Sequence, residues 1–191
     1  MSEQDRQDRV PPGQSVTKGF PVLSKSGTPK VNLDEWTLTV TGAVENTMEL
    51  TWGEFLELHP TTDVSDFHCV TGWSKLGCEW TGVRFQEILE LVGPKPGASH
   101  VMVGSADGYT TNLALDDLER DDVLLAYEFE GEPLDPDHGG PLRLIVPHKY
   151  AWKSAKWVNS LEFMGEDRRG YWEKRGYSNT ADPWTEDRYS Y

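Results

Sequence analysis

Cysteine is scarce in this chain of 191 residues, which has only Cys69 and Cys78. Two thiols are too few for a disulfide framework, and their spacing fits no zinc-binding motif. No apolar run approaches the roughly 20 residues that a membrane-spanning helix needs. The charged residues 1–9 lack the apolar core of a secretion signal, and the twin-arginine type of signal is absent as well. The sequence therefore predicts a cytoplasmic protein.

Basic residues are also few, because 18 lysines and arginines stand against 32 acidic residues, giving a net charge of −14. A phosphate backbone requires a basic footprint, so nucleic acid is excluded as a partner. The acidic residues are spread along the chain rather than gathered in a tail. This distribution indicates either an ordinary solubilising surface or adaptation to a cytoplasm rich in salt.

The length predicts one domain with a full hydrophobic core. Residues 1–19 are predicted to form a flexible or loosely draped arm, because Pro11-Pro12-Gly13 breaks any helix. Residues 20–191 form the domain, including an aromatic C-terminal tail. Many short strands with a few short helices indicate the α+β class with mixed β-sheets.

Local patterns place several elements. Residues 36–41 alternate apolar and polar side chains and predict a half-buried strand. Thr51 and Glu54 have the spacing of a capping box, which predicts that a short helix begins there. A second helix is expected over residues 84–92, where apolar side chains share one face. Residues 158–164 are expected to form the last strand.

The segment 66–74, Asp-Phe-His-Cys-Val-Thr-Gly-Trp-Ser, contains the first candidate site. A strand-like run breaks at Gly72, so Cys69 lies where a strand gives way to a loop, a common place for a functional side chain. The alternative is that Cys69 is a small buried hydrophobic residue. Cys78 belongs to no motif and is interpreted as structural.

A second segment, 137–157, gathers cations within a strongly acidic protein. Glycines at 139 and 140 allow the backbone to approach a ligand closely. Basic side chains with Ser154 and backbone N–H groups can hold a phosphate. The alternative is that the cations pair with the protein's own carboxylates. The cations are Arg143, Lys149, Lys153 and Lys156.

Taken together, the segments 66–74 and 138–157 resemble the molybdopterin-binding domain of the sulfite oxidase family. The tail from Gly170 to Trp184 is similar to the ending of short, stand-alone prokaryotic members. These members are related to the catalytic subunits of protein-methionine-sulfoxide reductases. The resemblance covers roughly residues 20–188. It implies the sulfite oxidase molybdopterin-binding fold and an oxidoreductase that carries molybdenum as Mo-molybdopterin.

The resemblance also implies roles for single residues. Cys69 matches the thiolate ligand of the metal, and a soft thiolate suits a metal already held by sulfur ligands. Arg143 is suited to a bidentate grip on the cofactor's phosphate. His68 either contacts the cofactor or is hydrogen-bonded so that it holds the loop. The cofactor-contacting positions are His68, Cys69, Ser105, His138, Arg143, Ser154, Ala155 and Lys156.

The implied reaction is oxygen-atom transfer on a small sulfur-containing substrate, either sulfite or a sulfoxide, or on a related oxyanion. No Cys-x-x-Cys-His haem motif is present, so the electrons must pass to or from a separate protein, a cytochrome or a membrane haem subunit. The aromatic tail either helps to dock that protein or fills a groove of its own domain.

Gly72 departs from the family pattern, because many sulfite-oxidising members carry a basic residue near this position. A sulfite anion requires positive charge at the metal. Lys75 and Arg84 are the nearby candidates to supply it, and the departure puts sulfite in doubt as the substrate.

Two other functions stay open at this point. The first is a non-catalytic molybdopterin-binding domain. The second is an enzyme that uses Cys69 as a nucleophile with His68 or His138 as its base. His68 is a poor candidate for that base, because adjacent side chains on a strand point to opposite faces.

Overall fold

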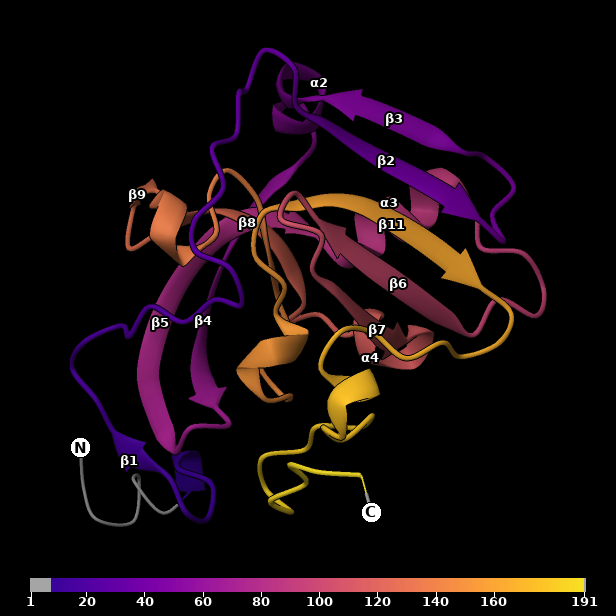
Figure 1. Cartoon of the computed structure of the whole chain (residues 1–191). Coiled ribbons are helices and arrows are strands. Elements are labelled where there is room, and N and C mark those ends of the chain that lie inside the picture. Colours follow the sequence, from indigo (N-terminus) through magenta and orange to yellow (C-terminus); the bar gives the residue numbers. More distant parts are fainter. Residues whose placement is uncertain (1–7, 191) are drawn as a thin grey trace.

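Two β-sheets form the molecule, which is described by a computed structural model for residues 8–190 (Figure 1). The first sheet has six strands, and its central strand β5 is paired with β4 along one edge and with β1 and β8 along the other. Its strands are β1 (Ser15–Val16), β4 (Pro60–Cys69), β5 (Trp73–Arg84), β8 (Leu124–Phe129), β9 (Glu132–Pro133) and β10 (Arg143–Ile145).

The second sheet has five strands in the order β3-β2-β11-β6-β7. Strand β11 pairs with β2 in parallel and with β6 antiparallel, so this sheet is mixed. The mixed sheets and short helices confirm the α+β class expected from the sequence. The strands are β2 (Thr37–Gly42), β3 (Met48–Thr51), β6 (His100–Ser105), β7 (Thr110–Ala114) and β11 (Val158–Met164).

Short helices connect the strands, and the capping box at the first of them is confirmed. The Thr51 hydroxyl accepts a hydrogen bond from the N–H of Glu54, whose carboxylate accepts one from the N–H of Thr51. The α-helices are α2 (Trp52–Leu56), α3 (Phe85–Val92) and α4 (Leu115–Leu118); the 3₁₀ helices are η1 (Pro136–His138), η2 (Ala151–Lys153) and η3 (Glu173–Arg175).

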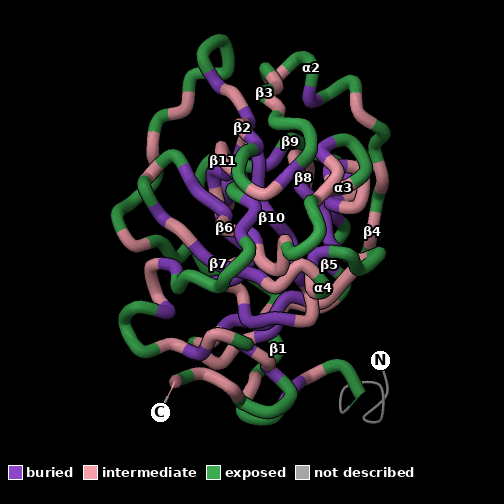
Figure 2. The backbone as a smooth tube through the Cα atoms, turned by 90° about the vertical axis from the view of Figure 1, so that its right-hand side faces the viewer, coloured by how far each residue is buried: buried purple, intermediate pink, exposed green. Residues whose placement is uncertain are grey.

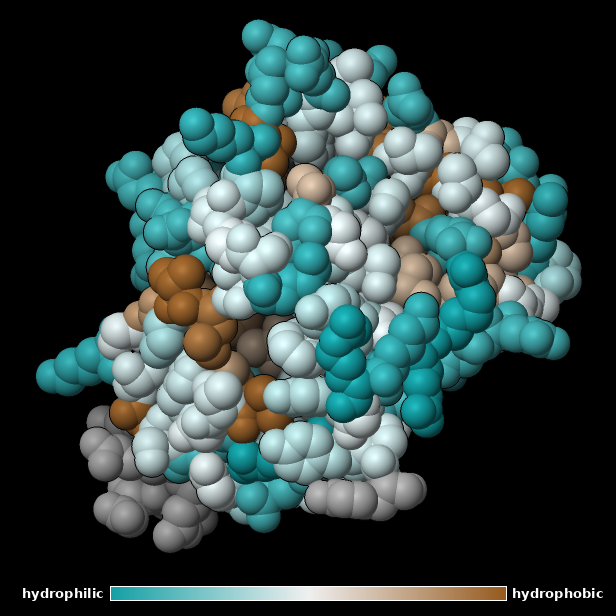
Figure 3. Space-filling model, viewed as in Figure 1, coloured by the Kyte–Doolittle hydropathy of each residue, from teal (hydrophilic) through white to brown (hydrophobic). Residues whose placement is uncertain are grey.

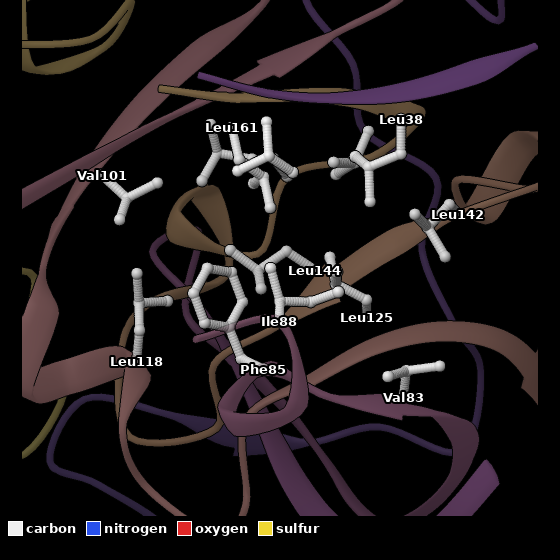
Figure 4. Close-up of a cluster of buried hydrophobic side chains, with 14 of the residues drawn as sticks. Leu38, Val83, Phe85, Ile88, Val101, Leu118, Leu125, Leu142, Leu144 and Leu161 are labelled. Carbon is white, nitrogen blue, oxygen red and sulfur yellow. The ribbon is translucent and has the colours of Figure 1, made fainter. Parts of the chain in front are cut away.

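The main hydrophobic core lies between the two sheets (Figure 4). Leu38 and Leu161 come from the second sheet, and Val83 and Leu125 come from the first. Helix α3 contributes its buried face to the same cluster. Many buried residues lie in the strands, and the segment between β10 and β11 is largely buried as well, whereas most other connections carry exposed residues (Figure 2). No helix in the described part of the chain is long and apolar enough to cross a membrane.

Two features differ from the sequence prediction. Residues 73–84 form the longest strand, β5, which was not predicted from the sequence, because turn-forming glycines stand directly before it at Gly72 and within it at Gly77. In the predicted arm, Ser15–Val16 pairs in parallel with the start of β5. Residues 1–7 of that arm lie outside the described residues.

At Gly82 there is no room for a side chain between β5 and β8. A Cβ atom there would lie 2.2 Å from the carbonyl oxygen of Leu125, which belongs to the backbone and cannot rotate away. We predict that Gly82→Ala lowers the free energy of unfolding in urea by about 3 kcal/mol. The matched control is Gly53→Ala in α2, where a Cβ meets no atom within 4 Å; its effect should be a gain of less than about 1 kcal/mol. Equal effects of the two variants would contradict this packing argument.

Candidate cofactor and metal site

A cavity of about 240 Å³ opens on the face shown in Figure 3, where hydrophobic side chains surround a hollow. It is built by segments far apart in the sequence: the stretch before β2, the end of β4 and the loop after it, the turn before β7, the segment 138–157 and the C-terminal tail. Six of the predicted site residues line it. These are Cys69, His138, Arg143, Ser154, Ala155 and Lys156.

Cys69 is the last residue of β4 and opens the ligand loop, residues 69–72. Alternation along the strand turns Phe67 and Cys69 towards the cavity. The thiol is only 6% exposed, and the Thr71 hydroxyl donates a hydrogen bond to its sulfur at 3.1 Å. Gly72, with a φ of 92°, allows the tight turn in which its N–H donates to the carbonyl of Cys69 at 3.0 Å.

The structure does not bring His68 into the cavity. Its side chain lies on the opposite face of β4, in a separate hollow. There the ring nitrogen Nδ1 lies 2.8 Å from the Ser74 hydroxyl, and burial lowers the pKa of the imidazole. This geometry matches a histidine that holds the loop, which was one of the two roles that the sequence left open.

Arg143 is a buried cation without a counter-charge. Within residues 8–190 its guanidinium forms no ion pair; Nη1 donates to the carbonyl of His138 at 2.7 Å, and Nε has no partner. The guanidinium lies 4.8 Å from the ring centroid of Phe67 and 5.6 Å from that of Phe20. Burial lowers its pKa to about 10. A buried charge of this kind is stabilised when an anion occupies the space beside it.

Lys156 adds a second cation to the same wall. Burial, followed by repulsion from Arg143, lowers its pKa to about 8. Its ammonium donates to the carbonyl of Asp137 at 2.7 Å and lies 4.6 Å from the ring centroid of Trp157. In the described part of the chain no carboxylate comes within ion-pair distance of it.

The other two cations of the segment pair with carboxylates, as the alternative interpretation proposed. Lys153 forms a buried ion pair with Glu173 at 2.7 Å, and Lys149 pairs with Asp117 at 3.0 Å. The segment therefore has two kinds of cation. Lys149 and Lys153, which do not line the cavity, are neutralised by the protein, whereas Arg143 and Lys156 line it and are left for a ligand.

The remaining predicted contact residues differ in position and in the hydrogen-bonding groups that they leave free for a ligand. The imidazole of His138 stacks on the ring of Phe20 at 4.2 Å. The Ser154 hydroxyl accepts from the N–H of Val146, which leaves its own proton to donate, whereas the N–H of Ala155 already donates to Lys153. The structure does not bring Ser105 to the cavity wall; it lies at the end of β6, and its buried hydroxyl has no hydrogen-bond partner in the described residues.

Several lining residues were not predicted from the sequence. Phe20 and Lys25 come from the stretch before β2, and Trp172 and Tyr177 come from the C-terminal tail. The tail thus fills a groove of its own domain. Its only signal in the sequence was a richness in aromatic residues, which does not indicate the partner of a given ring.

Neither cation suggested near Gly72 lines the cavity. The Lys75 ammonium donates to the carbonyl of Lys18, and Arg84 pairs with Asp121. The wall next to the ligand loop is instead largely apolar and aromatic, formed by Val70, Trp73 and Tyr177 among others.

The cavity has a thiol at the ligand loop and an unpaired buried guanidinium nearby. No group of three or more histidine, cysteine or carboxylate side chains within residues 8–190 could hold a metal ion. A metal at Cys69 must therefore bring most of its ligands with it. These features define a protein that binds an anionic organic cofactor carrying a metal.

Comparisons with known proteins give the family. Residues 25–172 match the model described as "Oxidoreductase molybdopterin binding domain". The protein named "Uncharacterized oxidoreductase YuiH" of Bacillus subtilis (strain 168) is 43% identical over 190 residues, which cover 99% of this chain and 96% of that protein. The chain belongs to the oxidoreductase molybdopterin-binding domain family.

More distant relatives are longer. The sulfite oxidase of Arabidopsis thaliana is 30% identical over 181 residues, covering 76% of this chain and 46% of that one. The protein-methionine-sulfoxide reductase catalytic subunit MsrP of Xanthomonas campestris is 31% identical over 150 residues, covering 70% and 46%. The chain thus spans less than half the length of these two enzymes.

The fold is shared with a solved structure, the sulfane dehydrogenase SoxCD of Paracoccus pantotrophus. The TM-score is 0.68 at 24% identity, covering 74% of this chain and 41% of that one. The chain is a molybdopterin-dependent oxidoreductase with the sulfite oxidase type of fold, and its cofactor is Mo-molybdopterin. The site fits this group, because the thiol supplies a soft ligand and the unpaired Arg143 Nε supplies a donor for a phosphate.

The pKa of Lys156 gives a pH prediction for anion binding. The ammonium is charged below a pH of about 8 and neutral above it. Sulfate keeps its charge over this range, so its affinity for the cofactor-free full chain should fall about tenfold between pH 7 and pH 9. Tryptophan fluorescence measures the binding, because Trp157 lies under the ammonium. Lys156→Met should bind sulfate weakly with little pH dependence, and an unchanged pH profile in this variant would contradict the assignment.

Proposed function

We propose that this protein transfers an oxygen atom to or from a small sulfur-containing substrate, and exchanges electrons with a separate redox protein. When bound, the molybdenum cofactor supplies the two-electron redox change. The observation that carries the proposal is the joining of the Cys69 thiol and the unpaired Arg143 guanidinium in one cavity. A cytoplasmic location is also part of the proposal, and cell fractionation tests it.

The chain's own residues hold and tune the cofactor. Cys69 is proposed as the protein ligand of the metal, and the hydrogen bond from Thr71 reduces the electron donation of its sulfur. Arg143 and Lys156 are proposed to bind the phosphate end, since both charges lack a carboxylate partner in the described residues. The proposed contacts of His138 and Ser154 line the same cavity.

The shape and charge of the wall favour a neutral sulfoxide over sulfite. Aromatic side chains from the tail, Trp172 and Tyr177, stand beside the ligand loop. Burial, then the neighbouring Tyr189 and Cys69, raises the pKa of Tyr177, so its phenol stays protonated and can donate to a substrate oxygen. The relative from Xanthomonas campestris, named as a protein-methionine-sulfoxide reductase subunit, supports the same choice.

We predict that Cys69→Ser lowers molybdenum, normally near one per chain, by at least about tenfold. Cys78→Ser is the matched control. Cys78 does not line the cavity; it is fully buried in the hydrophobic cluster that includes Phe67, and burial raises the pKa of its thiol to about 12. Metal analysis and circular dichroism separate metal loss from unfolding. Equal metal loss in both variants would reject Cys69 as the ligand.

A metal-free protein whose Cys69 reacts with a thiol-directed acyl probe would favour the cysteine-nucleophile function instead. A protein that binds the pterin, but is reduced by no electron donor, would favour a binding domain without turnover.

The substrate prediction uses the visible absorption of the loaded protein. Dimethyl sulfoxide or methionine sulfoxide should restore the oxidised spectrum of the reduced protein, at least about tenfold faster than nitrate. Sulfite should leave the oxidised spectrum unchanged, because Lys25, the other cation that lines the cavity in the described residues, pairs with Asp107. Rapid bleaching by sulfite would reverse the choice of substrate.

A further inference from the structure

The N-terminal segment around residues 13–15 and the C-terminal tail meet at the ligand loop, residues 69–72. From the N-terminal segment, the Gln14 amide donates to the carbonyl of Cys69 at 3.2 Å, and the N–H of Ser15 donates to the carbonyl of Gly72 at 2.9 Å. From the C-terminal tail, Nη1 of Arg188 donates to the carbonyl of Val70 at 3.0 Å. Strand β1 and the tail lie at the same end of the β4–β5 pair (Figure 1).

The two ends also contact each other. Gly13 has a φ of 68°, and a Cβ atom there would lie 2.6 Å from Oε1 of Glu186 and 3.0 Å from Nη2 of Arg188. Nη2 in turn lies 3.3 Å from Oε1 of Glu186, and the guanidinium lies 5.5 Å from the ring centroid of Tyr150. Arg188 is therefore held by Glu186 and Tyr150 and lies close to Gly13, while Nη1 reaches the ligand loop.

The tail keeps its place by bonds that do not involve the Arg188 side chain. Its carbonyl at Ala181 accepts from the N–H of Tyr150 at 2.8 Å. The Ser178 hydroxyl donates to Asp187, and the backbone N–H of Ser178 donates to the carbonyl of Arg188. Loss of the guanidinium should leave the tail folded and remove only its bond to the loop.

We propose that Arg188 is a positioning residue for the metal ligand, and this proposal rests on the proposed role of Cys69. The carbonyl of Val70 belongs to the residue directly after Cys69. A hydrogen bond from a charged donor is roughly twice as strong as a neutral one. Together with the Gln14 bond to the carbonyl of Cys69, it restrains the backbone on the C-terminal side of the thiol and so restrains the direction of Sγ.

The test compares two tail arginines that make similar contacts in different places. Arg188 donates to the carbonyl of Val70 and lies over Tyr150, whereas Arg175 donates to the carbonyl of Tyr171 and lies 3.6 Å from that residue's ring centroid. The variants are Arg188→Met, Arg188→Lys and, as the matched control, Arg175→Met, each in the full chain. The Cys78→Ser background leaves one thiol to report.

Two measurements are made on each variant. In cofactor-free protein, the rate at which Cys69 reacts with 5,5′-dithiobis(2-nitrobenzoic acid) reports how firmly the loop holds the thiol. In loaded protein, the visible absorption and the rate of pterin release report the bond to the metal. We expect Arg188→Met to raise the thiol reaction rate and the pterin release rate about tenfold each and to shift the absorption band, and Arg188→Lys to restore part of each.

Equal thiol rates in Arg188→Met and the parent would overturn the proposal. Equal increases in Arg188→Met and Arg175→Met would also overturn it, because the tail would then act only as general support. A failure of the proposed function would give a result that differs from both of these outcomes. In that case Cys69→Ser keeps its molybdenum, while the effect of Arg188 on thiol reactivity persists.

Discussion

The buried charge of Arg143 is the constraint on which the site depends. An acidic protein has many carboxylates with which to neutralise a cation, and it does so for Lys149 and Lys153. Arg143 instead lies among aromatic rings with Nε unpaired in the described residues. A buried guanidinium without an ion pair favours the binding of an anion. This single side chain therefore fits a cofactor that carries a phosphate.

This constraint explains why the cavity is assembled from distant segments. Strand β10 carries Arg143 into the first sheet, and β4 places Phe67 and Cys69 beside it. The turn after β10 then brings Lys156 close enough for the two cations to repel each other. Gly139 makes this approach possible, since a Cβ there would lie 2.9 Å from Cγ of Lys156. Strand pairing and the small residue Gly139 thus bring Arg143 and Lys156 together at one cavity wall, whereas the sequence showed only that they lie in the same segment.

The predictions from the sequence succeeded where a local rule decides the outcome. The capping box at Thr51 and the strand ending at Cys69 each follow from neighbouring residues. The predictions were incomplete where the structure depends on packing between residues far apart in the sequence. Pattern reading could not find the long strand after Gly72 or show that Tyr177 of the tail would line the cavity.

The contact between the N-terminal segment and the C-terminal tail affects where a redox protein can bind. Residues 13–15 and 186–188 lie against each other beside the ligand loop. A redox protein that binds against either of these two segments would therefore lie on the same side of the molecule as Cys69, so its electrons would have a short path to the cavity.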